Sequence, residues 1–273
     1  MARSEAGPDF IEALARGLDV VKVFRPARPT MTLADVAAAV QLPRPTARRI
    51  LITLEQLGYV RSGPVGFSLT PRVLELGMSY VESMGLWEVA RPHMEALVGR
   101  TGESTSIAQL DGSDIVYVSR VAVPKIIALS VSVGTRFPAL QTSLGKVLLA
   151  ALSDEQADAV LAEPSRSGVQ PRWTPTREER IAVLCQVRAQ GWALTDEQLA
   201  LGIRSIAAPL RDGAGTFVAA MNVTVHALET SVEKLLELHL PLLLQAAGAV
   251  SADFALRTSI PHTTVVAEQP LRA

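Results

Sequence analysis

Arg48 and Arg49 stand side by side in a stretch whose apolar residues recur at three- and four-residue steps. That repeat predicts an amphipathic helix over residues 44–57, with both arginines outside its apolar stripe. Guanidinium groups on an exposed helix face bind phosphate oxygens and the edge of guanine. The stretch therefore indicates a nucleic-acid interface, although an ordinary solvated helix face also carries arginines.

The start of the same helix carries groups suited to a phosphate. Proline is tolerated in a first helical turn, where its missing N–H would have no partner. Arg44 and Thr46 lie near the positive end of the helix dipole, which stabilises an anion. The candidate DNA-contacting residues are Arg44, Pro45, Thr46, Arg48, Arg49, Thr53 and Arg61.

The elements around this helix predict a winged helix-turn-helix. Thr32 is a suitable N-cap for a helix over Leu33–Val40, and Asp35 three residues later completes a capping box. A short turn leads to the arginine-bearing helix, and two strands at 59–61 and 66–69 form the wing. Arg61 lies on this wing. It is either a DNA contact or simply a solvent-exposed residue at a strand end, and the sequence supports both equally.

The composition is compatible with such an interface. The chain has 273 residues, enough for two domains, and 48% hydrophobic residues, which excludes wholesale disorder. Aromatic residues are only 4%, which disfavours base stacking on single strands. The net charge is -1, but residues 25–61 hold six arginines against two carboxylates, a local charge of +4. Basic character is therefore concentrated in one small domain.

The hydrophobic period changes at Ser104. Strands are predicted at 104–110, 115–121, 126–131, 203–210 and 217–225. Helices are predicted at 10–24, 86–100, 144–152, 154–161, 176–190 and 232–256. The predicted domains are a disordered tail (1–8), the winged helix-turn-helix (9–70), a linking helix (71–85), an α+β domain (86–257) and a disordered tail (258–273). The linking helix has a wide apolar face, which suggests contact with a second copy.

Polar residues on the predicted last strand mark a second candidate site. Asn222 and Thr224 are two residues apart, so they share one face of that strand. Ser143 and Leu144 open a helix whose free N–H groups can receive a carboxylate. Polar groups inside a fold need partners, and a bound ligand, ordered water or neighbouring backbone would each serve.

Other chemistries are disfavoured. The single cysteine, Cys185, excludes an internal disulfide, and its apolar helical setting predicts a buried thiol. The four histidines lack metal-ligand spacing, and Asp196 and Glu197 follow a strand as neighbours, so their carboxylates point apart. We expect no metal, no cofactor and no catalysis. No apolar run reaches the length of a membrane span, so we expect a cytoplasmic protein that does not contact membranes.

Several of these motifs together resemble the IclR family of bacterial transcriptional regulators. The resembling segments are 10–20, 48–51, 57–60, 69–71, 133–136, 142–146 and 202–209. Within that family, residues 9–18 and 114–121 are most similar to the subgroup that regulates protocatechuate and 4-hydroxybenzoate catabolism. The resemblance implies a GAF-like effector-binding domain with a central antiparallel sheet, and a dimer or dimer of dimers on a palindromic operator in double-stranded DNA. The subgroup implies an aromatic acid or a β-ketoadipate-type effector.

The resemblance also implies which residues contact the effector. By position in matching motifs these are Ile126, Ser143, Leu144, Thr195, Ser205, Asn222 and Thr224. Some family members carry aspartate and cysteine where this chain has Thr195 and Ser205, which disfavours a small keto-acid such as glyoxylate. Arg136 and Arg120 are further candidates for pairing with an aromatic carboxylate, although either would also serve in a structural salt bridge.

Two functions of different classes remain at this point. One is a ligand-controlled transcription factor whose helix at 44–57 enters the major groove. The other is a small-molecule-sensing or enzymatic module whose winged helix contacts protein. The arginine cluster discriminates them, because only the first requires Arg48 and Arg49 for specific DNA binding.

Overall fold

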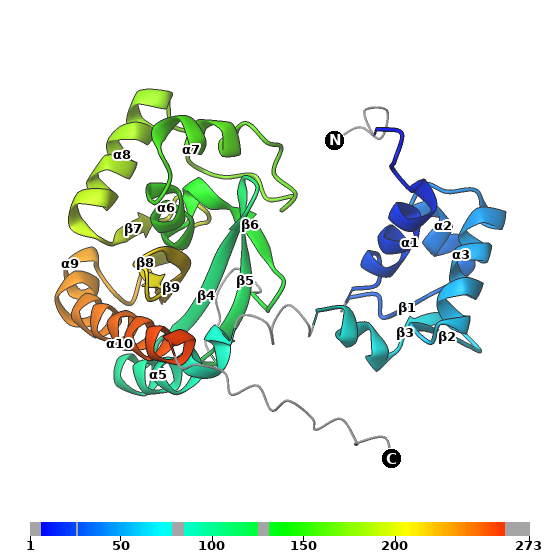
Figure 1. The fold of residues 1–273 in the computed structure, drawn as a ribbon, viewed down its shortest axis with the longest axis horizontal. Helices are drawn as coiled ribbons and strands as arrows, with labels where there is room; N and C mark the ends of the chain where they lie inside the picture. Colours follow the sequence, from blue (N-terminus) through cyan, green and yellow to red (C-terminus); the bar gives the residue numbers. More distant parts are fainter. Residues whose placement is uncertain (1–6, 26, 78–84, 125–130, 260–273) are drawn as a thin grey trace, which may run out of the picture. The chain divides into compact units, whose positions relative to one another are not determined.

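The computed structural model describes residues 7–25, 27–77, 85–124 and 131–259. The chain divides into two compact units, Met1–Met84 and Gly85–Ala273 (Figure 1). The predicted terminal tails lie largely outside the described residues, as do most of the predicted strand at 126–131 and residues 78–84 of the predicted linking helix.

Up to Leu69, the described residues of the N-terminal unit form three helices and a small sheet. The helices are α1 (Glu12–Lys22), α2 (Leu33–Ala39) and α3 (Arg44–Gln56). The strands are β1 (Thr30–Met31), β2 (Val60–Gly63) and β3 (Gly66–Leu69), in the order β1-β3-β2. The predicted helices and wing are present, whereas the two-residue strand β1 was not predicted because it is too short to show a period.

Local sequence signals account for these elements. The capping box at the start of α2 is present: Thr32 Oγ1 accepts a hydrogen bond from the Asp35 N–H, and Asp35 Oδ2 accepts from the Thr32 N–H at 3.0 Å. Helix α3 begins with proline in its first turn. A core of buried side chains then holds α1, α2, α3 and the sheet together: Val20, Met31, Val36, Leu51 and Val60.

The segment after the wing begins as a 3-10 helix, η2 (Pro71–Leu74), and the Thr70 hydroxyl accepts a hydrogen bond from the Arg72 N–H. Leu74 and Leu76 are exposed, at 68% and 54%. The described part of the predicted linking helix therefore shows the apolar surface that its sequence predicted.

The C-terminal unit is built on a six-stranded antiparallel sheet, in the order β6-β5-β4-β9-β8-β7. Its strands are β4 (Ser104–Asp111), β5 (Asp114–Val121), β6 (Arg136–Pro138), β7 (Ala193–Asp196), β8 (Ile203–Arg211) and β9 (Phe217–His226). The confirmed architecture is α+β with a central antiparallel sheet. The three-residue strand β6 was not predicted.

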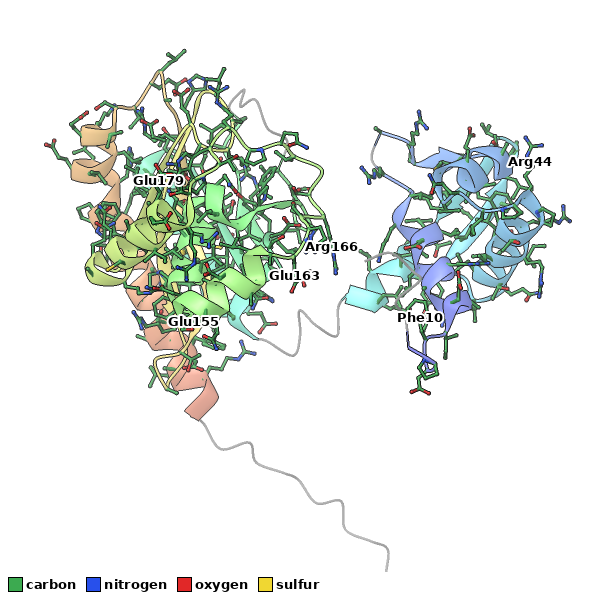
Figure 2. All side chains as sticks on the ribbon, turned by 90° about the horizontal axis from the view of Figure 1, so that it is seen from above. Phe10, Arg44, Glu155, Glu163, Arg166 and Glu179 are labelled. Carbon is green, nitrogen blue, oxygen red and sulfur yellow. The ribbon has the colours of Figure 1, made fainter. Side chains whose placement is uncertain are left out.

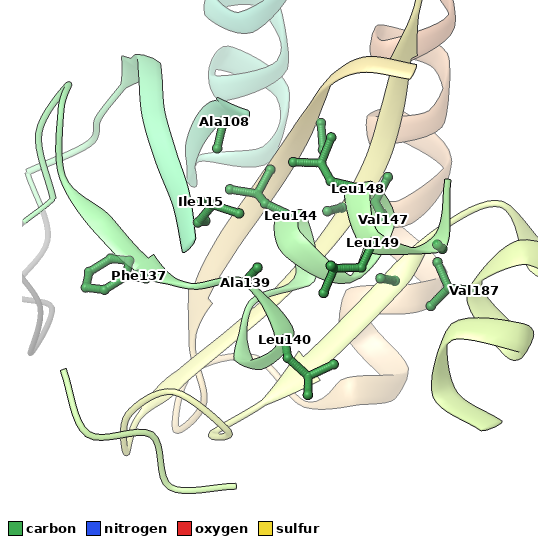
Figure 3. Close-up of a cluster of buried hydrophobic side chains, with 14 of the residues drawn as sticks. Ala108, Ile115, Phe137, Ala139, Leu140, Leu144, Val147, Leu148, Leu149 and Val187 are labelled. Carbon is green, nitrogen blue, oxygen red and sulfur yellow. The ribbon is translucent and has the colours of Figure 1, made fainter. Parts of the chain in front are cut away.

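Helices cover this sheet in two layers. They are α5 (Leu86–Thr101), α6 (Ser143–Ala150), α7 (Asp154–Leu161), α8 (Arg177–Gln190), α9 (Val232–Lys234), a π-helical segment η4 (Leu235–His239) and α10 (Leu240–Ser259). Figure 3 shows α6 in front of the strands, and α5 and α10 behind them. A 3-10 helix, η3 (Ala139–Gln141), leads directly into α6. The core between α6 and the sheet includes Ala108, Ile115, Leu144 and Leu149 (Figure 3).

Two expectations need correction. Cys185 is exposed, because the buried face of α8 runs through Leu184 and Val187, and the next residue along a helix turns away from it. The continuous helical segment Val232–Arg257 is long and apolar enough to span a membrane, with a mean hydropathy of 1.4 over its most apolar window. A third of that window is buried in this unit, including Leu243 and Val250, whereas Leu238 and Leu244 are exposed.

Gly145 allows α6 to pack against η3. A Cβ atom at this position would lie 2.1 Å from the backbone oxygen of Ala139, closer than any real contact. The Gly145 N–H also donates to Thr142 Oγ1 at 3.0 Å, which caps the helix. Helix α6 can therefore begin at this place only because residue 145 has no side chain.

We expect Gly145→Ala to lower the free energy of unfolding by about 1–3 kcal/mol, because the added methyl must push backbone apart. Gly99→Ala is the matched control: Gly99 lies inside α5 with open space around it. That control should raise stability by about 0.5–1 kcal/mol through helix propensity. Urea unfolding of the full chain measures both, and a Gly145→Ala variant as stable as wild type would contradict the packing argument.

Candidate functional site

Helix α3 presents an exposed cationic surface. Ala47 and Leu51 are fully buried and fix the rotation of the helix, so Arg44, Arg48 and Arg49 are exposed. Arg44 lies at the outer edge of the N-terminal unit (Figure 2). Within the described ranges, no ion pair joins any of these three guanidinium groups to a carboxylate. Their donors are available to an external anion.

The remaining candidates on α3 differ in exposure. Pro45 and Thr53 are exposed and Thr46 is half-buried. The Thr53 hydroxyl donates to the Arg49 backbone oxygen at 2.9 Å, so it keeps only acceptor capacity for DNA. Thr46, Arg49 and Thr53 also line a groove of about 750 Å³ between α1 and α3.

The wing is fixed to α3 by hydrogen bonds. The Ser62 N–H donates to Glu55 Oε1 at 2.9 Å, and the Ser62 hydroxyl donates to the same oxygen. These bonds lower the pKa of Glu55 from its ordinary value. Arg61 is exposed on β2, and its Nε donates to Ser68 Oγ at 3.1 Å, which leaves its Nη groups available. The wing therefore holds Arg61 at a defined place beside α3.

A second site is a cavity of about 40 Å³ in the C-terminal unit, where the sheet register brings polar residues from five strands together. One row across the sheet pairs Thr195 with Ser205 and Ser205 with Thr224. The next row pairs Asn222 with Ser106 and Ser106 with Arg120. Directly paired residues share a face, so both rows point the same way. The lining residues are Tyr117, Arg120, Val131, Phe137, Gln141, Thr142, Ser143, Thr195, Leu199, Ile203, Ser205, Asn222 and Thr224.

Hydroxyl groups at one end of the cavity bond to one another. Ser205 Oγ lies 2.8 Å from Ser143 Oγ and 2.9 Å from Thr195 Oγ1. Asn222 Nδ2 donates to Thr224 Oγ1 at 2.9 Å, while Asn222 Oδ1 accepts from a backbone N–H of β4. Hydroxyls both donate and accept, so this cluster can reorient around a polar ligand group.

Arg120 supplies the cationic group of the cavity. Its Nη1 donates to Ser106 Oγ at 2.9 Å, but its buried Nε has no hydrogen-bond partner among the described residues. Burial lowers the pKa of Arg120 from its ordinary value, yet a guanidinium stays charged at neutral pH. An oxyanion would satisfy the unused donor.

Tyr117 and Phe137 add aromatic walls that sequence reasoning missed. Their rings meet edge to face, with centroids 5.8 Å apart. Burial raises the pKa of Tyr117 to about 12, so its hydroxyl remains protonated. Strict alternation would put Tyr117 and Arg120 on opposite faces of β5. A register shift opposite Ile107 and Ala108 inserts one extra residue in β5 and brings both to the cavity.

Three expected effector contacts are not found in this cavity. Arg136 lies on β6 and pairs with Asp111 at 2.6 Å and with Asp114 at 3.4 Å, which corrects its expected place at the ligand. Leu144 is fully buried in the core between α6 and the sheet. Ile126 lies outside the described residues.

Comparison with known proteins identifies both units. Residues 13–64 match the IclR helix-turn-helix domain, and residues 78–252 match the IclR C-terminal domain of bacterial transcriptional regulators. The chain belongs to the IclR family. It is therefore a DNA-binding transcriptional regulator, with the winged helix as its DNA-binding domain. Of the two functions considered from the sequence, this favours the ligand-controlled transcription factor.

Individual relatives of this IclR regulator cover nearly all of it. The Pca regulon regulatory protein of Pseudomonas putida is 38% identical over 88% of this chain and 82% of its own. A transcriptional regulator from Rhodococcus sp. RHA1 is 44% identical, with a TM-score of 0.79 over 91% of this chain and all of its own. An IclR homologue from Microbacterium hydrocarbonoxydans, solved with 4-hydroxybenzoate, is 27% identical, with a TM-score of 0.78 over 90% of this chain and all of its own.

Helix α6 of this IclR regulator carries a buried lysine. Lys146 is only 3% exposed, and its Nζ donates to the Leu194 backbone oxygen at 3.0 Å and to Gln198 Oε1 at 2.6 Å. The ammonium also lies 5.1 Å from the centre of the Trp173 ring. Desolvation by burial lowers the pKa of Lys146 to about 8.

This pKa predicts a pH-dependent stability. Between about pH 8 and the ordinary lysine value of 10.5, the unfolded chain binds more protons than the folded one, so the free energy of unfolding rises with pH. The full rise is roughly 3 kcal/mol at 1.36 kcal/mol per pKa unit. The substitution Lys146→Met should remove this rise in the free energy of unfolding. Lys234 is exposed, so Lys234→Met should leave the rise unchanged. Urea unfolding from pH 7 to pH 10.5 tests this, and a Lys146→Met variant that keeps the full rise would contradict it.

Proposed function

We propose that this regulator controls genes of aromatic-acid catabolism and that an aromatic carboxylate is its effector. The observation that carries the proposal is the cavity, in which the half-buried guanidinium of Arg120, whose Nε–H has no partner among the described residues, faces hydroxyl groups and aromatic walls. The name of the Pseudomonas putida relative and the 4-hydroxybenzoate in the Microbacterium homologue support it.

The chemistry of the cavity suits an aromatic acid with a second polar group. The Arg120 Nε–H donates to a carboxylate oxygen, and the cluster of Ser143, Thr195 and Ser205 exchanges hydrogen bonds with a ring hydroxyl. Asn222 and Thr224 provide further polar contacts, while Tyr117 and Phe137 flank the ring. Charge-assisted bonds of this kind contribute more than neutral ones when water is excluded.

The cavity volume implies that the effector changes the domain. About 40 Å³ holds only a few water molecules, each of which needs roughly 10–15 Å³ of such volume. A benzoate ring does not fit without movement of the lining side chains. Binding therefore favours a conformation different from this one, and that difference is what a ligand needs to shift an equilibrium. Coupling of about 1–3 kcal/mol between effector and DNA is typical.

The DNA-binding half of the proposal places α3 in the major groove. Three arginines of this helix contact phosphates or base edges: Arg44, Arg48 and Arg49. Further contacts come from Pro45, Thr46 and Thr53 on the same helix and from Arg61 on the wing. Two copies of the chain bind a palindrome whose half-sites are about 34 Å apart, or a multiple of that distance. The exposed side chains of Leu14 and Leu18 on α1 support self-association, because an apolar helix face is stabilised by a partner.

Replacing Arg48 and Arg49 by alanine should abolish specific binding to an operator selected from random DNA by the wild-type protein. A bidentate arginine–guanine contact contributes about 1–3 kcal/mol to discrimination between the correct base and another one. Each lost phosphate contact lowers by about one unit the slope of the logarithm of the binding constant against the logarithm of the salt concentration. Fluorescence anisotropy measures affinity, and sedimentation of the complex should give at least two chains per palindrome.

Arg91→Ala combined with Arg100→Ala removes the same charge from α5 in the other unit and serves as the control. If both double variants lost affinity equally, the loss would be explained by the change in net charge and not by contacts of α3. Undiminished specific binding after loss of Arg48 and Arg49 would refute the assignment of α3 as the reading helix.

The effector proposal predicts selective thermal stabilisation by 4-hydroxybenzoate or protocatechuate, tested beside β-ketoadipate and glyoxylate. At ~100 times its dissociation constant a ligand stabilises the fold by about 2.7 kcal/mol. Arg120→Met should abolish the shift, whereas Arg136→Met, whose guanidinium is paired outside the cavity, should retain it. A shift with glyoxylate alone, or one that survives in Arg120→Met, would overturn the assignment.

A further inference from the structure

Two carboxylates stand among the six arginines of residues 25–61, and both accept hydrogen bonds. Asp35 completes the capping box of α2. Glu55 lies in the last turn of α3, the helix proposed to enter the major groove. A negative charge on that helix repels DNA phosphates, so it lowers affinity unless the same group also promotes binding in another way.

The Glu55 carboxylate holds the outer half of strand β2. Its Oε1 accepts a hydrogen bond from the Ser62 N–H at 2.9 Å and another from the Ser62 hydroxyl. Strand β2 is at the edge of the sheet, so one of its sides has no neighbouring strand among the described residues. Val60 at the start of β2 is buried, whereas residues 61–63 are exposed. The two bonds to Glu55 therefore join the exposed part of the wing directly to α3.

The same bonds determine the direction in which Arg61 points. Successive residues of a strand face opposite sides, so Arg61 is turned to the outer side when Ser62 is turned toward α3. There the Arg61 Nε donates to Ser68 Oγ at 3.1 Å, on the paired strand β3. This bond orients the guanidinium and leaves its Nη groups for an external acceptor such as a phosphate oxygen. Loss of the Glu55 bonds would allow β2, and Arg61 with it, to move relative to α3.

The chemistry of position 55 offers a matched pair of substitutions. The hydroxyl of Ser62, and then its N–H, hold the pKa of the Glu55 carboxyl below its ordinary value, so this group is ionised at neutral pH. Glutamine has the same length, and its carbonyl oxygen can accept from both donors without a charge. Alanine provides no acceptor. The two substitutions thus remove the same charge and differ in whether the wing stays bonded to α3.

We propose that Glu55 is a positioning residue for DNA recognition, which joins the wing to α3 so that Arg61 contacts a backbone phosphate while α3 reads the major groove. The inference rests on the proposed placement of α3 and the wing on DNA. Arg61 makes the contact, and Glu55 acts through it without touching DNA. A wing that is already ordered raises affinity, because less conformational freedom is lost on binding.

Fluorescence anisotropy of the full chain on the selected operator, at several salt concentrations, tests the proposal. Arg61→Ala should weaken binding about tenfold and lower the salt slope by about one unit per bound chain, because one phosphate contact is lost. Glu55→Ala should show the same two losses when it is compared with Glu55→Gln, which carries the same charge. Glu55→Gln itself should bind at least as tightly as wild type. Adding Arg61→Ala to Glu55→Ala should cause no further loss.

Arg48→Ala provides the control for this comparison, because Arg48 lies on α3 itself. Its loss of affinity should multiply with that of Glu55→Ala. An unchanged salt slope in Glu55→Ala would indicate a purely structural role and overturn the proposal. Equal affinities of Glu55→Ala and Glu55→Gln, or a full further loss on adding Arg61→Ala, would do the same. Failure of α3 as the reading helix is distinguishable, since the Arg48→Ala, Arg49→Ala double variant would then keep specific binding whatever the Glu55 variants do.

Discussion

The close packing of Gly145 on the backbone of Ala139 is the constraint on which the C-terminal unit depends. Only a residue without a side chain lets α6 start there, with Thr142 as its cap. That start places Ser143 against Ser205 in the effector cavity and leaves Gln141 in the wall of that cavity. One steric contact thus positions the polar groups at the start of α6 that line the effector cavity.

Sheet register, rather than sequence proximity, assembles the effector cavity. Thr195, Ser205 and Thr224 come from three strands, and Arg120 reaches the same face because β5 contains one extra residue. The alternation of polar and apolar residues predicts the faces of a single regular strand, and it correctly put Asn222 and Thr224 together. It does not predict which strands pair or where a bulge reverses the faces, so Tyr117 and Phe137 could not be found from the sequence.

Elements governed by local signals were predictable, whereas those defined by tertiary contacts were not. The capping box of Thr32 and Asp35, the proline in the first turn of α3 and the glycine that ends α8 each act within a few residues. Strands β1 and β6 have only two and three residues and exist through their partners. Cys185 was misjudged because an apolar run in a helix hides which of its residues faces the core. For Arg136 the sequence left a ligand contact and a structural salt bridge open, because its partners Asp111 and Asp114 precede it by more than twenty residues.

Arg120 explains why an anion should act as a switch in this domain. Its guanidinium is half-buried, its pKa is lowered by desolvation, and within the described residues no carboxylate forms an ion pair with it. Desolvating a charge without a counter-ion is unfavourable, so a carboxylate placed beside Arg120 would be stabilised. A carboxylate reaches that place only in a conformation wide enough to admit it. The anionic group of the proposed effector would therefore bind more tightly to a conformation with a wider cavity, and such a difference in affinity is the free energy available to alter DNA binding.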